Sequence, residues 1–196
     1  MKQQTTNRST IKNEVFTIPN ILSFFRICLI PWMVWLYCVE QAYQAVGYVL
    51  ILSGITDVVD GFLARKFNMI SNLGKILDPI ADKLTQAAML ICLTIRFPLM
   101  MMPLILMVMK EAFMAITGIL LIRKKGIVRG AKWHGKAATV LLYAVMVEHV
   151  VWAEISSTAS AVSISLCVVM IVISFVLYGI DNIKSLKQCE KAQEEV

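Results

Sequence analysis

Long hydrophobic runs, separated by short polar segments, recur along almost the whole chain. Several of these runs approach the roughly 20 residues that an α-helix needs to cross a lipid bilayer. The pattern therefore predicts about six membrane spans. Their approximate bounds are 21–39, 46–65, 75–95, 99–122, 136–153 and 160–181. The second and third spans are the least hydrophobic of the six, because they carry aspartates.

Composition supports an all-α integral membrane protein. Of the 196 residues, 58% are hydrophobic and 16% are charged, and the mean hydropathy of +0.72 lies outside the range of soluble domains. The first stretch, MKQQTTNRSTIKNEVFT, is polar, so we expect no signal peptide. The segment VFTIPNILS, which overlaps the end of this stretch, is predicted either to lie at the membrane interface or to lead directly into the first span. Without repeats or low-complexity tracts, a single membrane domain over 1–196 is expected.

Lysine and arginine gather in alternate connections between the predicted spans. The connections at 65–75 and 123–136 are basic, as are both ends of the chain, whereas those near Glu40 and at 148–154 contain no lysine or arginine. The positive-inside rule then places both termini and both basic connections in the cytoplasm, with Arg96 as one exception. We therefore expect a multi-pass protein of a bacterial inner membrane. Its net charge of +6 serves orientation and contact with anionic lipids, and we expect no nucleic-acid partner.

Four aspartates inside the second and third spans are the main candidates for chemistry, since charged residues within spans are costly. On a helix, Asp57 and Asp60 fall with Gly61, Ala64 and Arg65 inside an arc of about 140°. Asp78 and Asp82 recur at a spacing of four residues and also share one helix face. Only the eight residues KFNMISNL separate these two patterns, so the spans are predicted to form an antiparallel helical hairpin with facing acidic surfaces.

Four carboxylates in a site with little water require compensating cations. Arg65, Lys75 and Lys83 are candidates, but two hard divalent cations suit an all-oxygen site better, and Mg²⁺ or Mn²⁺ is favoured over Ca²⁺. A pair of such ions supports displacement at phosphorus, so phosphoryl-type transfer is the leading prediction. A cation-coupled or proton-coupled transporter is the alternative from a different class. It is disfavoured because the acidic residues cluster toward the cytoplasmic ends of two adjacent spans instead of following a route across the membrane.

The stretch from Asp57 to Asp82 is similar to the signature of the CDP-alcohol phosphatidyltransferase family, D-x2-D-G-x2-A-R-x8-G-x3-D-x3-D, at every fixed position. The resemblance implies six transmembrane helices and transfer of a phosphatidyl group from CDP-diacylglycerol to an alcohol, with release of CMP. It implies that the four aspartates bind two metal ions and that Asp82 is also the general base. It further implies donor contacts from Gly61, Ala64, Arg65, Ser71, Asn20 and Ser23.

The identity of the acceptor depends on weaker resemblances. The segment IPNILSFFRICLIP resembles the opening of bacterial phosphatidylglycerophosphate synthases, which favours glycerol 3-phosphate. In the second half, Gly135-Lys136-Ala137-Ala138-Thr139 lacks a lysine usual in those synthases and is closer to CMP-forming cardiolipin synthases, whose acceptor is phosphatidylglycerol. A phosphorylated acceptor needs cations, and the candidates are Arg26, Arg123, Arg129, Lys132 and Lys136. Homodimers are common in this family, so a homodimer is compatible with the resemblance.

The sequence also predicts the environments of one charged pair, the two histidines and the five cysteines. Lys110 and Glu111 lie within the fourth span and point about 100° apart, so we expect each to pair with another helix instead of with its neighbour. His134 and His149 are expected to be solvated or interfacial. The five cysteines are scattered and have no metal-ligand spacing, so we expect packing residues in a reduced environment.

Overall fold

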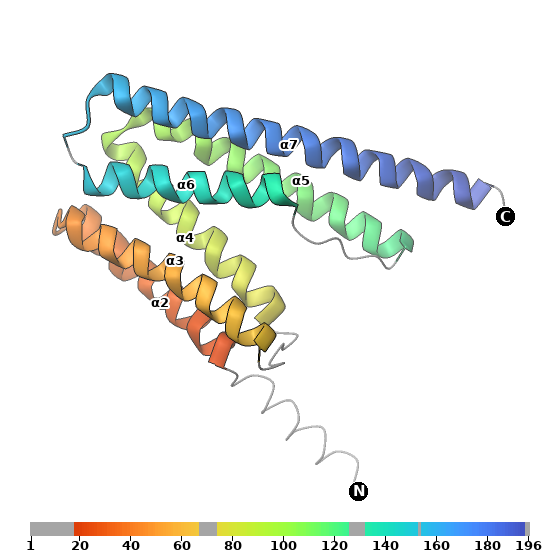
Figure 1. Cartoon of the computed structure of the whole chain (residues 1–196), viewed down its shortest axis with the longest axis horizontal. Coiled ribbons are helices and arrows are strands. Elements are labelled where there is room, and N and C mark those ends of the chain that lie inside the picture. The colour runs from red at the N-terminus through yellow and green to blue at the C-terminus, as the bar shows by residue number, and fades with distance from the viewer. Residues whose placement is uncertain (1–17, 67–73, 126–131, 153, 195–196) are drawn as a thin grey trace, which may run out of the picture. The chain divides into compact units, whose positions relative to one another are not determined.

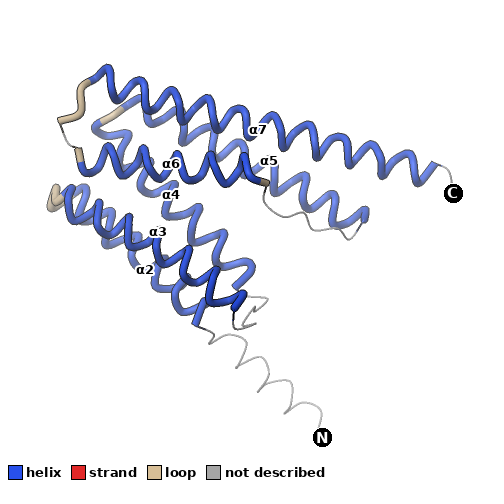
Figure 2. Tube along the Cα trace, viewed as in Figure 1, coloured by secondary structure: helices blue, strands red, loops and turns tan. Residues whose placement is uncertain are grey.

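The computed structural model describes residues 18–66, 74–125, 132–152 and 154–194, and for some residues near helix ends it describes the backbone alone. Within these ranges every regular element is helical and no strand is present (Figures 1 and 2). The elements are α2 (Ile18–Cys38), α3 (Tyr43–Lys66), α4 (Gly74–Arg96), the short 3₁₀ helix η1 (Pro98–Met100), α5 (Met101–Lys125), α6 (Trp133–Val151) and α7 (Ser157–Glu194). The all-α fold class is confirmed.

Each of the six predicted spans coincides with one long helix. The largest difference is at the end of α7, which continues to Glu194 although the hydrophobic run ends near 181. Its last turns contain lysine, glutamine, glutamate and alanine, all of which favour a helix without help from the membrane. Of the expected interfacial segment, residues 15–17 lie outside the described part of the chain. Residues 18–23 form the first turns of α2.

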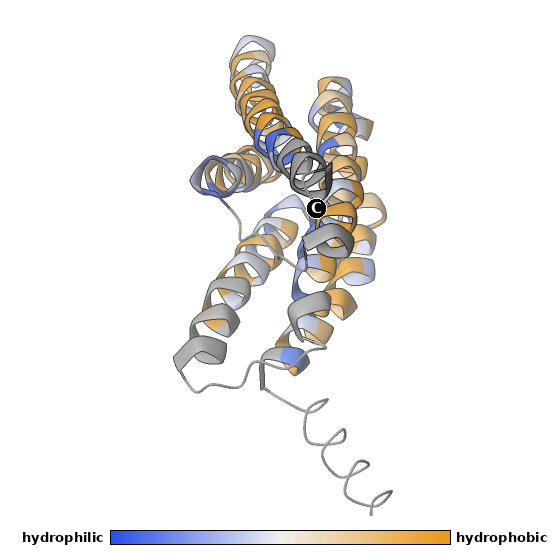
Figure 3. Cartoon of the chain, turned by 90° about the vertical axis from the view of Figure 1, so that its right-hand side faces the viewer, coloured by the Kyte–Doolittle hydropathy of each residue, from blue (hydrophilic) through white to orange (hydrophobic). Residues whose placement is uncertain are grey.

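Three of the described helices are long and apolar enough to cross a membrane: Asn20–Cys38, Pro98–Leu121 and Ser157–Ser185. Tyr43–Thr56 of α3 forms a shorter apolar helix. Figure 3 shows hydrophobic residues, in orange, along much of the described helices. These features are those of a multi-pass membrane protein. The full count of six spans stays a prediction, because α3, α4 and α6 are not among these three helices.

The chain divides into two compact units. The first unit comprises Met1–Ile95 and Val147–Ala153, and the second comprises Arg96–Met146 and Glu154–Val196. The aspartates of the signature all belong to the first unit. Most of the expected acceptor-binding cations belong to the second. Whether both units act as one domain stays a prediction.

In the first unit, α2 packs against α3, and a short turn joins them. The rings of Tyr37 and Tyr43 lie edge to face across this turn, 5.2 Å apart. Two side-chain contacts join α2 to α4: Ser23 contacts Asp78 near the start of both helices, and Cys38 contacts Cys92 near their ends. Therefore α2 and α4 run parallel, and α3 runs opposite to both, as the predicted hairpin requires.

In the second unit, α5 and α7 run parallel and pack against each other. Phe113 of α5 lies edge to face with Phe175 of α7, and further along both helices Asn182 donates a hydrogen bond to the Thr117 hydroxyl. The start of α6 lies against α7, where the His134 ring is 4.4 Å from that of Tyr178. These contacts place a polar cluster among the three helices.

Two structural predictions from the sequence are wrong. Lys110 pairs with its neighbour Glu111, with a distance of 3.0 Å between Nζ and Oε1, because the long lysine stem spans the angle between adjacent positions. His134 and His149 are both buried. The ring of His134 contacts Ser174 and Tyr178, and that of His149 lies 3.8 Å from Glu148. Each histidine ring has an apolar body, and packing can cover it when a polar partner is near.

Candidate active site

The four aspartates lie on two antiparallel helices of the first unit. Asp57 and Asp60 are in the last turns of α3, and Asp78 and Asp82 are in the first turns of α4. Since the helices run in opposite directions, these two segments lie at the same end of the unit (Figure 1). The side chains of Asp57, Asp60, Gly61, Ala64 and Arg65, and the whole of Ser71, lie outside the described part of the structure. The described geometry therefore concerns α2 and α4.

Asp78 is held by a residue from another helix. The hydroxyl of Ser23 on α2 donates a hydrogen bond to Oδ1 of Asp78, across 55 positions of sequence. Ser23 is fully buried, whereas Asp78 is half-buried. This bond orients the carboxylate and leaves its other oxygen available for further ligands, because a carboxylate accepts several hydrogen bonds or metal bonds.

Ser23 belongs to a buried polar stripe on α2. Asn20, Ser23 and Arg26 follow one another at intervals of three residues, and each is at most 5% exposed. Arg26 is among the largest fully buried side chains in the protein. Charged and polar side chains are buried at this level only where other polar groups compensate them. Further along α2 the buried residues Leu29 and Met33 are apolar.

Asp82 is surrounded by a small network on its own helix. The side-chain amide of Gln86, one turn later, donates to both carboxylate oxygens at 2.9 Å. Lys83 lies 3.4 Å from Oδ2 of Asp82 and also donates to Oε1 of Gln86 at 3.3 Å. Gln86 is completely buried, and the side chain of Asp82 is 16% exposed. The network compensates the charge of Asp82 and restricts its rotation.

The donor atoms of this site suit a hard divalent cation. Asp78 and Asp82 present carboxylate oxygens from successive turns of one helix face, and Ser23 adds a hydroxyl beside them. Mg²⁺ and Mn²⁺ prefer such oxygen ligands. Among the described side chains, no group of three or more histidine, cysteine, aspartate or glutamate residues is close enough to hold an ion. The carboxylates of Asp57 and Asp60 on α3 lie outside the described side chains.

The expected acceptor-binding cations have different surroundings. Arg26 is buried in the first unit, as described above. In the second unit, Lys132 forms an ion pair with Asp181 of α7, and Lys136 is exposed on the first turn of α6. The side chains of Arg123 and Arg129 lie outside the described residues. Lys132 and Lys136 thus share one end of α6, but the charge of Lys132 already has a partner.

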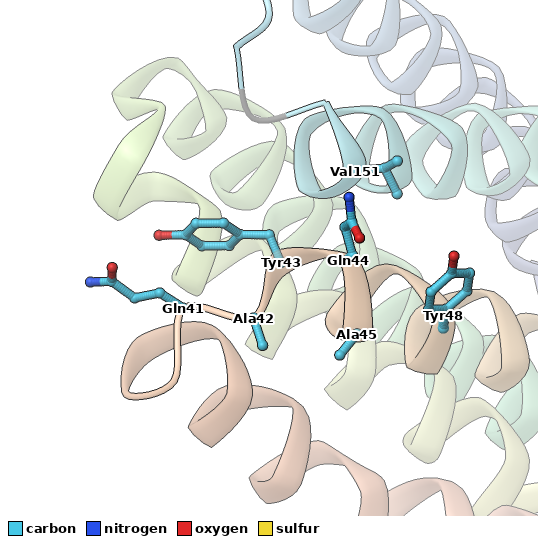
Figure 4. Close-up of a pocket in the computed structure, with 7 residues that line it drawn as sticks. All are labelled: Gln41, Ala42, Tyr43, Gln44, Ala45, Tyr48 and Val151. Atoms are coloured by element: carbon cyan, nitrogen blue, oxygen red, sulfur yellow. The ribbon is translucent and has the colours of Figure 1, made fainter.

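A shallow pocket lies where α2 joins α3, near the end of α6 that belongs to the first unit. It is lined by Gln41, Ala42, Tyr43, Gln44, Ala45, Tyr48 and Val151 (Figure 4). Figure 4 shows Gln44 directed toward the helix that carries Val151. None of the lining residues is charged. The pocket also lies at the opposite ends of α2 and α3 from the aspartates.

Sequence reasoning missed Gln86 and did not foresee the contact that Ser23 makes. Gln86 received no role, although a fully buried glutamine four residues after Asp82 is placed to contact it. Ser23 was expected to contact the donor, and its described contact is with Asp78. The spacing from Asp82 was a local clue to Gln86. No local pattern connects Ser23 with a residue 55 positions away.

Helices long enough to span a membrane, together with aspartates on two antiparallel helices, define an all-helical membrane protein with an acidic site. The family model for CDP-alcohol phosphatidyltransferase matches residues 16–178. The chain belongs to the CDP-alcohol phosphatidyltransferase family.

The chain is also similar to individual members of this family. It is 34% identical over 140 residues to a CDP-diacylglycerol–glycerol-3-phosphate 3-phosphatidyltransferase of Bacillus subtilis, covering 64% of this chain and 72% of the relative. It is 40% identical over 140 residues to a CMP-forming cardiolipin synthase of Streptomyces coelicolor, covering 67% and 64%. A fusion of CMP-forming cardiolipin synthase and mitochondrial hydrolase from Schizosaccharomyces pombe is 38% identical over 86 residues, covering 44% of this chain and 14% of the fusion. For these last two, the match spans less than two thirds of the relative.

Proposed function

We propose that this chain transfers the phosphatidyl group of CDP-diacylglycerol to an alcohol and releases CMP. The observation that carries the proposal is the placement of a complete family signature at one end of two antiparallel helices, with Asp78 and Asp82 held on one face of α4. Membership of the family favours this enzyme over a transporter. The same signature supports phospholipid synthesis as the biological role.

Members of this family generally depend on divalent metal ions. Asp57, Asp60, Asp78 and Asp82 are proposed to hold two ions, either Mg²⁺ or Mn²⁺. The oxygen donors of Asp78, Asp82 and Ser23 fit such ions, and the Ser23 hydroxyl fixes one carboxylate in place. When bound, the ions would neutralise negative charge that develops on the donor phosphates.

In the proposed reaction, Asp82 accepts the proton of the acceptor hydroxyl. The acceptor oxygen forms a bond to the phosphorus that carries the diacylglycerol, and the bond from that phosphorus to the oxygen of CMP breaks. Gln86 and Lys83 keep the Asp82 carboxylate in one orientation, so that it does not have to be ordered during the reaction. Contacts to the donor are proposed for Gly61, Ala64, Arg65, Ser71, Asn20 and Ser23.

The proposed acceptor is glycerol 3-phosphate. The similarity to the Bacillus subtilis relative and the segment IPNILSFFRICLIP favour it. The acceptor phosphate is proposed to bind cations among Arg26, Arg123, Arg129, Lys132 and Lys136.

Phosphatidylglycerol is the second candidate for the acceptor. It is supported by the Gly-Lys-Ala-Ala-Thr sequence at 135–139, by the cardiolipin synthase of Streptomyces coelicolor, and by the pairing of Lys132 with Asp181.

The membrane topology, the domain count and the oligomeric state are also proposals. Six spans would place the aspartates and both termini on the cytoplasmic side of an inner membrane, following the distribution of basic residues. The chain is proposed to act as one membrane domain, which the continuous family match over 16–178 supports. A homodimer is compatible with the exposed apolar faces of the helices.

The proposal is tested by measuring CMP release from CDP-diacylglycerol by the purified protein with Mg²⁺ or Mn²⁺. We expect release only when an acceptor is added, with glycerol 3-phosphate faster than phosphatidylglycerol, and none after chelation of the metal. Inositol phosphate serves as a third acceptor. Activity with phosphatidylglycerol alone would replace the first choice of acceptor by the second. The absence of CMP release with every acceptor would contradict the enzyme itself.

Replacing Gln86 by leucine is expected to lower the turnover of CMP release and to raise the Mg²⁺ concentration for half-maximal activity, each by about tenfold. Loss of a residue that orients a metal ligand typically has effects of this size. Thr85→Val is the matched control, because Thr85 is the preceding buried polar residue on α4 and its hydroxyl donates to the carbonyl of Ala81 on the same helix. Equal losses in both variants would show that Gln86 has no specific effect on Asp82.

A further inference from the structure

Two cysteines that are distant in sequence lie side by side in the first unit. The Sγ atoms of Cys38 and Cys92 are 3.9 Å apart, although 54 positions separate the residues. Cys38 is the last residue of α2 and is exposed, whereas Cys92 lies near the end of α4 and is 3% exposed. Both are free thiols in the structure. They take no part in the proposed reaction, because they lie at the opposite ends of α2 and α4 from Ser23 and Asp78.

The distance between the two sulfurs permits a covalent link. A disulfide bond is about 2.05 Å long, so the sulfurs must approach by roughly 2 Å, which rotation of the cysteine side chains can supply. Cys38 ends α2 and is followed by a turn. At the other end of the same two helices, the bond between Ser23 and Asp78 keeps α2 and α4 in register.

We propose that Cys38 and Cys92 form a reversible disulfide that joins α2 to α4. The oxidant is a protein or small molecule that carries a disulfide. The exposed Cys38 attacks as a thiolate, forms a mixed disulfide and releases one thiol of the oxidant. Cys92 then loses its proton and attacks the Cys38 sulfur, which forms the internal disulfide and releases the second thiol. Two electrons and two protons thus pass from the cysteines to the oxidant.

The location of the pair suits this chemistry. In the proposed orientation, the ends of α2 and α4 that carry the cysteines face away from the cytoplasm. Disulfides persist on that side of the membrane, whereas the cytoplasm keeps thiols reduced. The bond would hold two helices whose other ends bear Ser23 and Asp78. It would also replace the sequence-based expectation that all five cysteines are reduced packing residues. The chemistry of the pair is independent of the proposed enzyme activity.

The test uses the purified full-length protein with oxidised glutathione as the disulfide oxidant. Thiols that remain free are then alkylated under denaturing conditions, and peptides are identified by mass spectrometry without reduction. We expect a peptide pair joined through Cys38 and Cys92 and the protection of two of the five thiols from alkylation. Reduction with dithiothreitol should restore both. Alkylation of all five cysteines, or a bond from Cys38 to any other cysteine or to a second chain, would overturn the proposal.

Cysteine variants distinguish the effect of the Cys38–Cys92 disulfide on stability from other effects of oxidation. Oxidation should raise the midpoint of thermal unfolding of the wild-type protein by about 5 °C, because the link restricts the unfolded chain. The midpoint should not move in Cys38→Ser or Cys92→Ser. Cys28→Ser is the matched control, since Cys28 is also exposed on α2, and it should respond to oxidation like the wild type. If a serine variant fails to fold, the peptide map of the wild-type protein still decides. An unchanged wild-type midpoint despite the mapped bond would overturn the stabilising effect.

Discussion

Changing Asp82 to asparagine is expected to lower the turnover of CMP release by at least about a hundredfold. A positioned general base typically accounts for a factor of this size or more. Asparagine has nearly the same shape as aspartate and can still accept a hydrogen bond from Gln86, but it cannot take the acceptor proton. The metal-dependent binding of CDP-diacylglycerol should stay largely intact, because the other three aspartates are unchanged. Steady-state kinetics and equilibrium binding of the donor measure the two effects separately.

The matched control for this variant is Glu40→Gln, which also removes one carboxylate. Glu40 is exposed in the turn after α2, at the opposite end of this helix from Ser23 and Asp78. Its replacement should leave both turnover and donor binding unchanged. Undiminished turnover in Asp82→Asn would remove the proposed role of Asp82 as the base. A joint loss of turnover and donor binding would instead assign Asp82 to metal binding alone.

Changing Gly135 to alanine is expected to destabilise the second unit by about 2 kcal/mol, a typical cost of overpacking. A Cβ atom on Gly135 would lie 2.5 Å from the hydroxyl oxygen of Tyr178 and 2.8 Å from its Cε2. Tyr178 is 6% exposed and cannot move freely, because its ring lies against His134 and its hydroxyl accepts a hydrogen bond from the backbone N–H of Lys132. Either the start of α6 or the tyrosine must shift, and the hydrogen bond between Lys132 and Tyr178 would weaken.

Thermal unfolding in detergent measures this effect. The midpoint should fall by about 4–8 °C for a protein of this size. Gly179→Ala is the control, since Gly179 follows Tyr178 on α7 and a Cβ there meets nothing within 4 Å. Its midpoint should stay the same or rise slightly, because alanine favours a helix more than glycine does. A similar decrease in both variants would mean that the contact with Tyr178 is not the cause.

Predictions from the sequence were most accurate where a property depends on neighbouring residues. The six hydrophobic runs located the six long helices, since helix formation and the length of an apolar run are local. The spacing of Asp78 and Asp82 placed them on one face of α4 for the same reason. The end of α7 was set too early because hydropathy alone marks the membrane span and says nothing of a polar helix that continues beyond it.

Predictions failed where a contact depends on a flexible side chain or on residues from another helix. Lys110 was expected to avoid Glu111 because adjacent positions point apart, but the prediction ignored the reach of the lysine stem. His134 was expected at the surface because its neighbours in sequence are polar or basic. In the structure, Ser174 and Tyr178 from α7 cover it, and no pattern near residue 134 indicates them.

The sequence by itself determined the helical architecture, the family signature and the two helices that carry the aspartates, because each of these follows from spacing along a single helix. Only the tertiary structure decided that Ser23 holds Asp78, that Lys132 pairs with Asp181 and that Cys38 meets Cys92. Each of these contacts joins residues 49 to 55 positions apart. Such contacts depend on the directions and rotations of whole helices as they pack, which no local spacing specifies.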